Sequence, residues 1–136
     1  MQISESFREY GKHTELTQAV VYGGVSQVPQ ERALREGVDI LVATPGRLLD
    51  LMSQGLVTLG SIEIFVLDEA DRMLDIGFRP DIEKILRKCP QSRQTLLLSA
   101  TVPPPVERLA RRYMRDPEKL DFSPGEISVE IGRAHV

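Results

Sequence analysis

Two neighbouring carboxylates stand directly behind an apolar run, and of all the residues in the chain this pair has the clearest chemistry. Asp68 and Glu69 follow the run at residues 62–67. A carboxylate at the end of a buried strand can hold Mg²⁺ beside a bound triphosphate, directly or through water. A second carboxylate one residue later can polarise an attacking water, so the pair could hydrolyse a phosphoanhydride. The simpler alternative is that two acidic residues cap the following helix.

Two other segments carry groups suited to contact with phosphate. Gly23 and Gly24 follow the apolar run 19–22, and the segment 44–47 reads Thr-Pro-Gly-Arg after the run 38–43. Glycine lets a phosphate approach the backbone closely, and arginine adds a rigid positive fork. Each segment alone has an ordinary explanation, a turn for the glycine pair and a helix start for Thr-Pro-Gly. Contacts of this kind read no base sequence.

The elements that must position these groups alternate between apolar runs and helical stretches, which predicts an α/β fold with a parallel β-sheet and flanking helices. Because the polar signatures follow the strands, we expect them at the carboxyl edge of the sheet, where ligands bind in such folds. The expected strands are 19–22, 38–43, 62–67, 95–98 and 120–122, and the expected helices are 28–36, a helix from Pro45, 80–88 and a helix after the prolines at 103–105.

Helical periodicity predicts which side chains of three of these helices face the core. In the last helix the apolar residues follow an i, i+3, i+4, i+7 pattern, which is typical of a single buried face. The predicted inward residues are Leu48, Leu49 and Met52 in the first of the three helices, Ile82, Ile85 and Leu86 in the second, and Val106, Leu109, Ala110 and Tyr113 in the third.

Composition places the chain among ordinary soluble globular proteins. It has 136 residues, of which 41% are hydrophobic and 27% charged, so one domain with an aliphatic core is expected. The net charge of −3 argues against coating nucleic acid by bulk charge, although local phosphate contacts remain open. No apolar run approaches membrane-spanning length, and we expect a cytoplasmic location and no membrane partner. The single cysteine, Cys89, excludes an internal disulfide.

The residues around the carboxylate pair resemble the signature of a known family. Residues 67–75 read Leu-Asp-Glu-Ala-Asp-Arg-Met-Leu-Asp and are followed by Gly77 and Phe78. This stretch is similar to that of the DEAD-box RNA helicases of superfamily 2, including the bacterial-type members. The glycine pair, Thr-Pro-Gly-Arg, and Ser-Ala-Thr at 99–101 match further family elements in the family's order. The resemblance covers residues 1–122.

The resemblance implies an ATP-dependent RNA helicase, in which RNA-stimulated ATP hydrolysis is coupled to local unwinding of an RNA duplex. ATP and Mg²⁺ would be the cofactors, and RNA would be bound largely independently of its sequence. Asp68 would ligate Mg²⁺ through water, Glu69 would activate the hydrolytic water, and Asp71 would couple to Ser99 and Thr101 by hydrogen bonds. The residues implied to line the RNA track are Gly23, Gly24, Thr44, Pro45, Gly46 and Arg47.

The family's ATP-gripping loop, a glycine-rich segment ending in Gly-Lys-Thr, is not found in the 136 residues. The nearest match, Gly-Lys-His-Thr at 11–14, lacks a preceding glycine-rich loop and strand and is interpreted as a helix C-terminus. We therefore interpret residues 1–122 as a partial first RecA-like lobe without its Walker A strand and loop, and residues 123–129 as the start of an interdomain linker. Such a fragment alone is expected to be inactive.

Two other functions remain as alternatives. A non-catalytic ATPase-like module that binds RNA as a scaffold would keep the same fold. A DNA-translocating relative is less favoured, because the tetrapeptide ends in Asp71 rather than in His and Ser-Ala-Thr favours the RNA branch.

Residues 130–136 match no family element and show no helical or strand pattern. Their sequence, Glu-Ile-Gly-Arg-Ala-His-Val, is the translation of a common sequencing-library adaptor preceded by a G, and the next codon of that adaptor is a stop. We interpret this tail as an artefact of a truncated read.

Overall fold

The computed structural model describes residues 2–23, 27–121 and 128–133. The chain divides into two compact units, unit 1 from Met1 to Thr58 and unit 2 from Leu59 to Val136. Each unit builds its own sheet, so each is described by itself.

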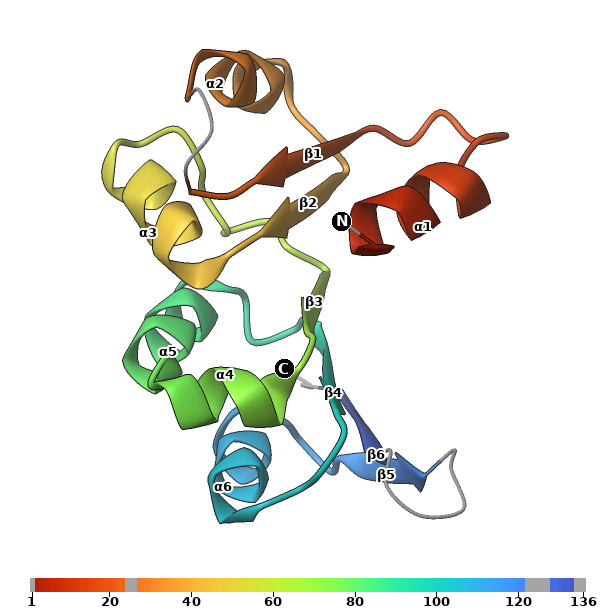
Figure 1. Cartoon of the computed structure of the whole chain (residues 1–136), viewed down its shortest axis with the longest axis vertical. Helices are drawn as coiled ribbons and strands as arrows, with labels where there is room; N and C mark the ends of the chain where they lie inside the picture. The colour runs from red at the N-terminus through yellow and green to blue at the C-terminus, as the bar shows by residue number, and fades with distance from the viewer. Residues whose placement is uncertain (1, 24–26, 122–127, 134–136) are drawn as a thin grey trace. The chain divides into compact units, whose positions relative to one another are not determined.

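Unit 1 contains two parallel strands and three helices (Figure 1). Strand β1 (Gln18–Val21) pairs with β2 (Ile40–Ala43) so that Gln18 lies opposite Ile40. Helix α1 (Gln2–Tyr10) lies on the opposite side of this pair from helix α3 (Pro45–Ser53), and α2 (Gln27–Glu36) connects the strands. The expected strand–helix–strand–helix order is therefore present, preceded by α1, which ends directly before Gly11, in agreement with the interpretation of residues 11–14 as a helix C-terminus.

The ends of the helices in unit 1 follow local backbone preferences. Gly37, directly after α2, has φ +84°, a conformation that glycine adopts without strain. Thr44 has extended backbone, with φ −86° and ψ 148°, and Pro45 begins α3. The buried face of α3 differs from the prediction: Leu48 and Leu51 are buried, whereas Leu49 and Met52 are half-buried. Leu48 and Leu51 are three residues apart, so they share a face.

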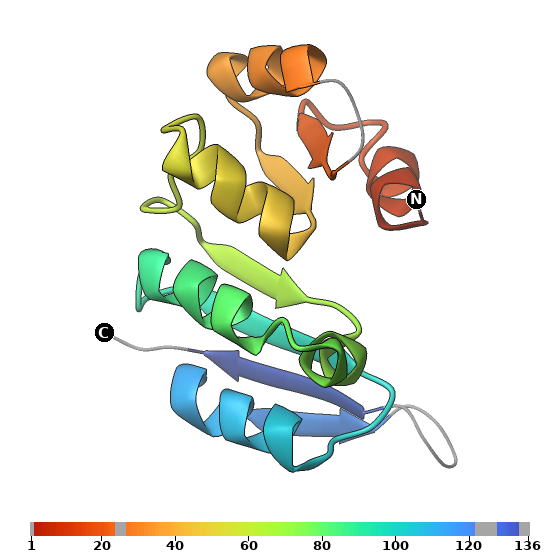
Figure 2. The ribbon, with the colours of Figure 1, turned by 60° about the vertical axis from the view of Figure 1, so that its left-hand side comes forward.

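Unit 2 is a four-stranded sheet in the order β3-β4-β6-β5, with three helices on one face (Figure 2). Strands β3 (Ile64–Leu67) and β4 (Gln94–Ser99) are parallel and paired from Ile64 opposite Gln94. Strand β6 (Ser128–Arg133) is antiparallel to both β4 and β5 (Glu118–Asp121). The helices are α4 (Ala70–Ile76), α5 (Arg79–Lys88) and α6 (Pro104–Tyr113).

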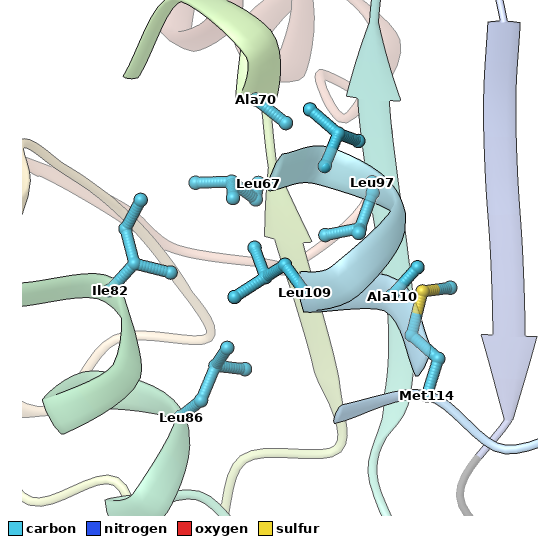
Figure 3. Packing of buried hydrophobic residues seen from close by; sticks show 9 residues of the cluster. Leu67, Ala70, Ile82, Leu86, Leu97, Leu109, Ala110 and Met114 are labelled. Carbon is cyan, nitrogen blue, oxygen red and sulfur yellow. The ribbon is translucent and has the colours of Figure 1, made fainter. Parts of the chain in front are cut away.

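The core of unit 2 lies between this sheet and its helices (Figure 3). Leu67 and Leu97 enter it from the two parallel strands, and burial of such side chains contributes roughly 1.5–3 kcal/mol each. The predicted inward faces of α5 and α6 are confirmed, except that Tyr113 is half-buried. The buried residues are Ile82, Ile85, Leu86, Val106, Leu109 and Ala110.

Two features of unit 2 differ from the prediction. Residues 64–67 are apolar throughout, yet Ile64 and Val66 are 57% and 48% exposed, because all three helices lie on the other face of the sheet. The expected absence of a strand after residue 130 was wrong, since Ser128–Arg133 forms β6. On the side away from β3, β6 pairs with the backbone of β4, and pairing through backbone groups does not require an apolar or alternating side-chain pattern. Residues 122–127 and 134–136 lie outside the described residues, and the origin of the tail stays a prediction.

Candidate functional site

Asp68 and Glu69 leave the carboxyl end of β3 in a tight turn. Glu69 has φ 52° and ψ 45°, the left-handed conformation, and directly precedes α4. The backbone N–H of Glu69 donates to Oδ1 of Asp68 at 2.9 Å. A non-glycine residue in this conformation is strained by roughly 1–2 kcal/mol. Strain at the end of a strand is typical of functional sites, where it aims a side chain that regular structure would turn elsewhere.

Asp71 joins the first turn of α4 to the end of β4. Its backbone N–H donates to Oγ of Ser99 at 3.0 Å. Its Oδ2 accepts from the Thr101 hydroxyl at 2.8 Å and from the Thr101 backbone N–H at 3.1 Å. Three hydrogen bonds therefore tie the segment after β3 to the segment after β4, and the hydrogen bonds expected between Asp71 and both Ser99 and Thr101 are present.

The pKa of Asp71 reflects two opposing effects. Burial disfavours the carboxylate and raises the pKa, but hydrogen bonds stabilise the charged form. The Thr101 hydroxyl contributes most of this stabilisation, followed by the backbone N–H of Arg72 and the Ser99 hydroxyl, and the net pKa lies below the ordinary value of 3.8. Asp71 is therefore an anion at neutral pH, acting as an acceptor in a fixed position rather than as a proton donor.

Glu69 is held much less tightly. Its side chain is 64% exposed, and its only recorded contact in the described region is to the guanidinium of Arg72, at 3.5 Å. An ion pair so exposed contributes little. The two acidic residues thus differ in role, with Asp71 fixed within the fold and Glu69 open to a ligand.

The carboxylates at the carboxyl end of β3 can be compared with the ligands that Mg²⁺ requires. Within the residues that the structure covers, no group of three or more His, Cys, Asp or Glu side chains could hold a metal ion. Mg²⁺ commonly takes only one or two protein carboxylates and completes its shell with water and phosphate oxygens. The half-buried carboxylate of Asp68, with Oδ1 oriented by the Glu69 N–H, fits that requirement.

In unit 1, Thr44 and Gly46 at the start of α3 are exposed, whereas Pro45 between them is buried. The hydroxyl of Thr44 makes no hydrogen bond to the helix it precedes, although its backbone carbonyl accepts from the Leu48 N–H at 3.0 Å. Gly23 and Gly46 lack positive φ, and a Cβ atom added to either would meet no described atom within 4 Å. Neither backbone conformation nor internal packing therefore requires glycine at these two positions. Close approach by an external ligand would require it.

Arg47 is turned toward its own unit. Its Nε donates to Oε1 of Gln30 at 3.3 Å, and its Nη1 lies 2.6 Å from Oδ2 of Asp50. The side chain is only 12% exposed, and its buried Nη2 has no partner among the described residues. Direct contact of this guanidinium with a phosphate would require release from Asp50.

The structure gathers the predicted residues at two places. Unit 2 brings Asp68, Glu69 and Asp71 to the same edge as Ser99 and Thr101. Unit 1 holds Gly23 after β1 and Thr44, Pro45, Gly46 and Arg47 at the start of α3, whereas Gly24 lies outside the described residues. The sequence reasoning missed Gln30, and its position in an otherwise polar helix gave no signal. None of the helices within residues 2–23 and 27–121 is long and apolar enough to span a membrane.

Comparison with known proteins gives consistent matches. The family model described as DEAD/DEAH box helicase matches residues 1–109. The ATP-dependent RNA helicase DBP2 of Eremothecium gossypii is 43% identical over 135 residues, which are 99% of this chain and 24% of that protein. The ATP-dependent RNA helicase RhlB of Shewanella denitrificans is 45% identical over 128 residues, 93% of this chain and 30% of that protein. The chain thus spans roughly a quarter of these relatives, and fungal and bacterial proteins match alike.

Solved structures show the same fold. The crystal structure of a DEAD box protein from the hyperthermophile Methanococcus jannaschii superposes with a TM-score of 0.80 at 41% identity, covering 85% of this chain and 31% of that one. A hypothetical ATP-dependent RNA helicase from Sulfolobus tokodaii gives a TM-score of 0.79 at 40% identity, covering 85% of this chain and 34% of that one.

Proposed function

Because this chain belongs to the DEAD/DEAH box helicase family, we propose that it forms part of the first ATPase lobe of an ATP-dependent RNA helicase. The chain holds carboxylates suited to Mg²⁺ and water but no Gly-Lys-Thr loop. ATP hydrolysis therefore belongs to the longer protein, of which this chain supplies one wall of the site. A cytoplasmic location is part of the same proposal.

In this proposal the end of β3 provides the chemistry. Mg²⁺, when bound, supplies positive charge on the phosphates. Asp68 would hold the ion through water, with its carboxylate oriented by the Glu69 N–H. Glu69 orients the attacking water and accepts its proton, a role that suits an exposed carboxylate with one weak contact. Its left-handed backbone aims it away from the direction that the strand would impose.

The start of α3 provides the RNA contact. The N–H groups of Gly46 and Arg47 lie in the first turn, where a helix carries partial positive charge and unpaired donors. The free hydroxyl of Thr44 adds a further donor, and the open space at Gly46 admits a phosphate. Gly23, with the same open space, and Gly24 would extend this surface. Such contacts go to the RNA backbone and are independent of base sequence.

The single observation that supports coupling best is the Asp71 bridge. Asp71 makes hydrogen bonds to both Ser99 and Thr101 in the segment after β4. A shift of the segment after β3 on hydrolysis would therefore move the segment after β4. We propose that this linkage transmits the state of the nucleotide to the RNA-binding parts of the protein.

The test is a chimera in which the matched segment of this chain replaces its counterpart in the Methanococcus jannaschii protein. The chimera should separate a short RNA duplex when ATP and Mg²⁺ are present and should fail without ATP. A matched Glu69→Gln chimera should bind the same RNA and leave it paired. A chimera that folds and binds RNA but separates no duplex would favour the scaffold alternative and contradict the proposal.

A further inference from the structure

A basic pocket lies at the end of unit 2 opposite the carboxylates. Its volume is about 410 Å³, and it forms where α5 and α6 end and β4 begins. Arg93 of the pocket lies six residues before Ser99 along β4, a separation of roughly 20 Å at about 3.3 Å per residue. It is thus distinct from the proposed ATP and Mg²⁺ site. The lining consists of Leu86, Arg87, Cys89, Gln91, Arg93, Arg112, Tyr113, Met114 and Arg115.

The buried side chain of Arg93 forms the floor of the pocket, and hydrogen bonds hold it in place. Arg93 is 5% exposed and is held by Oγ1 of Thr95 at 3.1 Å, the carbonyl of Pro90 at 3.1 Å and the carbonyl of Tyr113 at 2.9 Å. All three acceptors are neutral, so its buried positive charge has no acidic partner in these bonds. Burial raises the pKa of the Cys89 thiol, opposed by the charge of Arg93, and the neutral thiol adds no negative charge.

The walls add three more guanidinium groups. Arg87, Arg112 and Arg115 are exposed, and no carboxylate lines the pocket. Arg112 stacks over the Tyr113 ring, 5.7 Å from its centroid, and approaches Glu83 only at 3.9 Å. No ion pair is recorded for Arg87 or Arg115 in the described part of the chain. The pocket therefore concentrates positive charge although the whole chain carries −3.

A simpler reason for arginines here is compensation of helix dipoles, since two helices end beside the pocket. A helix C-terminus carries about half a negative charge, so two of them require roughly one positive charge. Arg93 already binds the carbonyl of Tyr113 at the end of α6, and Lys88 stands in the last turn of α5. Four arginines exceed that requirement.

We propose that the basic pocket binds an acidic segment of a protein partner, with a carboxylate side chain entering between Arg87, Arg93 and Arg115. Charge complementarity supports an anion, and guanidinium groups bind carboxylates with paired hydrogen bonds. Leu86 and Met114, which also line the pocket, favour a peptide with apolar neighbours over a sugar-phosphate chain. The surface would tether the helicase to a partner and take no part in hydrolysis.

The test measures binding of a short fluorescent peptide, rich in Glu with interspersed Leu, to the full 136-residue chain by anisotropy. Arg87→Gln combined with Arg115→Gln should weaken binding about tenfold, since two exposed charge contacts are lost. Arg108→Gln with Arg111→Gln is the control, because both arginines are exposed on α6 and lie outside the pocket. The control should bind as the parent does, and a peptide with Gln in place of Glu should not bind.

The contradicting results are distinct. Equal losses in the two double variants would show an effect of bulk charge alone, and absence of peptide binding by the parent would reject the site. Binding of single-stranded RNA that depends on Arg87 and Arg115, with no binding of the peptide, would make the pocket an RNA surface instead. Circular dichroism of both double variants should match the parent, since all four arginines are exposed.

Discussion

Replacing Asp71 by Ala removes the acceptor that joins α4 to the end of β4. Two bonds from Thr101 are lost, at 2.8 and 3.1 Å. A typical hydrogen bond contributes about 0.5–1.5 kcal/mol to stability, and one to a charged group about 1.5–3 kcal/mol. Because Asp71 is half-buried, the expected loss in the free energy of unfolding is about 2 kcal/mol at neutral pH.

The matched control is Asp75→Ala, an exposed residue on the same helix with no recorded bond to β4 in the described region. Both changes replace Asp by Ala in α4, so the gain in helix propensity is similar. Asp71 lies in the first turn of α4 and Asp75 in the last, so the helix dipole adds roughly 0.3–1 kcal/mol per position to the difference, and the bridge itself is isolated by the double-mutant cycle below. The assay is urea unfolding of the full chain, followed by circular dichroism. Thr101→Val completes a double-mutant cycle, with an expected coupling of about 1 kcal/mol.

The pH dependence gives an independent check of the same bridge. The pKa of folded Asp71 lies below 3.8, so its contribution to stability is complete above that value and is lost as pH falls through the folded pKa. The difference between Asp71→Ala and Asp75→Ala should therefore be constant from neutral pH down to about pH 5 and shrink below about pH 4. Equal unfolding free energies for the two variants at neutral pH would refute the reasoning.

Three further changes test other parts of the account. Glu69→Gly should leave the full chain as stable as the parent or about 1 kcal/mol more stable, because the strain of the left-handed backbone is relieved. The same change should abolish ATP hydrolysis by the chimera. A Glu69→Ala variant more stable than Glu69→Gly would contradict the claim of backbone strain. Gly46→Ala should stabilise α3 by about 0.5–1 kcal/mol and weaken RNA binding in a filter assay; unchanged RNA affinity would remove Gly46 from the contact surface. Gln30→Glu, which adds a second carboxylate beside Arg47, should hold its guanidinium more firmly and weaken RNA binding, whereas Gln30→Ala should bind RNA at least as well as the parent; equal affinities of the two variants would assign Gln30 no part.

The sequence predicted the parts of the fold that rest on strong periodicity. The runs that became β3 and β4 are mostly apolar, and α5 and α6 carry apolar stripes, so their inward residues were correctly assigned except for the half-buried Tyr113. Motif order placed polar residues at strand ends, and the bridge from Asp71 to Thr101 is present. Such patterns can be read from one segment of sequence alone, without knowing which helices or strands it packs against.

Other features depend on tertiary contacts that one chain segment does not reveal. The exposure of Ile64 and Val66 depends on which face the helices cover. The pairing of β6 depends on the free side of β4, and the fixed position of Arg47 depends on Gln30 in another helix. The left-handed backbone of Glu69 contradicts its local preference, as expected where function rather than propensity determines the conformation.

The central claim is that Glu69 is the hydrolytic base of an RNA-stimulated ATPase lobe. The most direct measurement is phosphate release from ATP by the chimera, with and without single-stranded RNA, compared with the same chimera carrying Glu69→Gln. The account predicts release that RNA stimulates and that falls on the order of a hundredfold or more with Glu69→Gln, as when a positioned general base is lost, while RNA affinity is unchanged. Equal release by both chimeras, at equal RNA affinity, would contradict it.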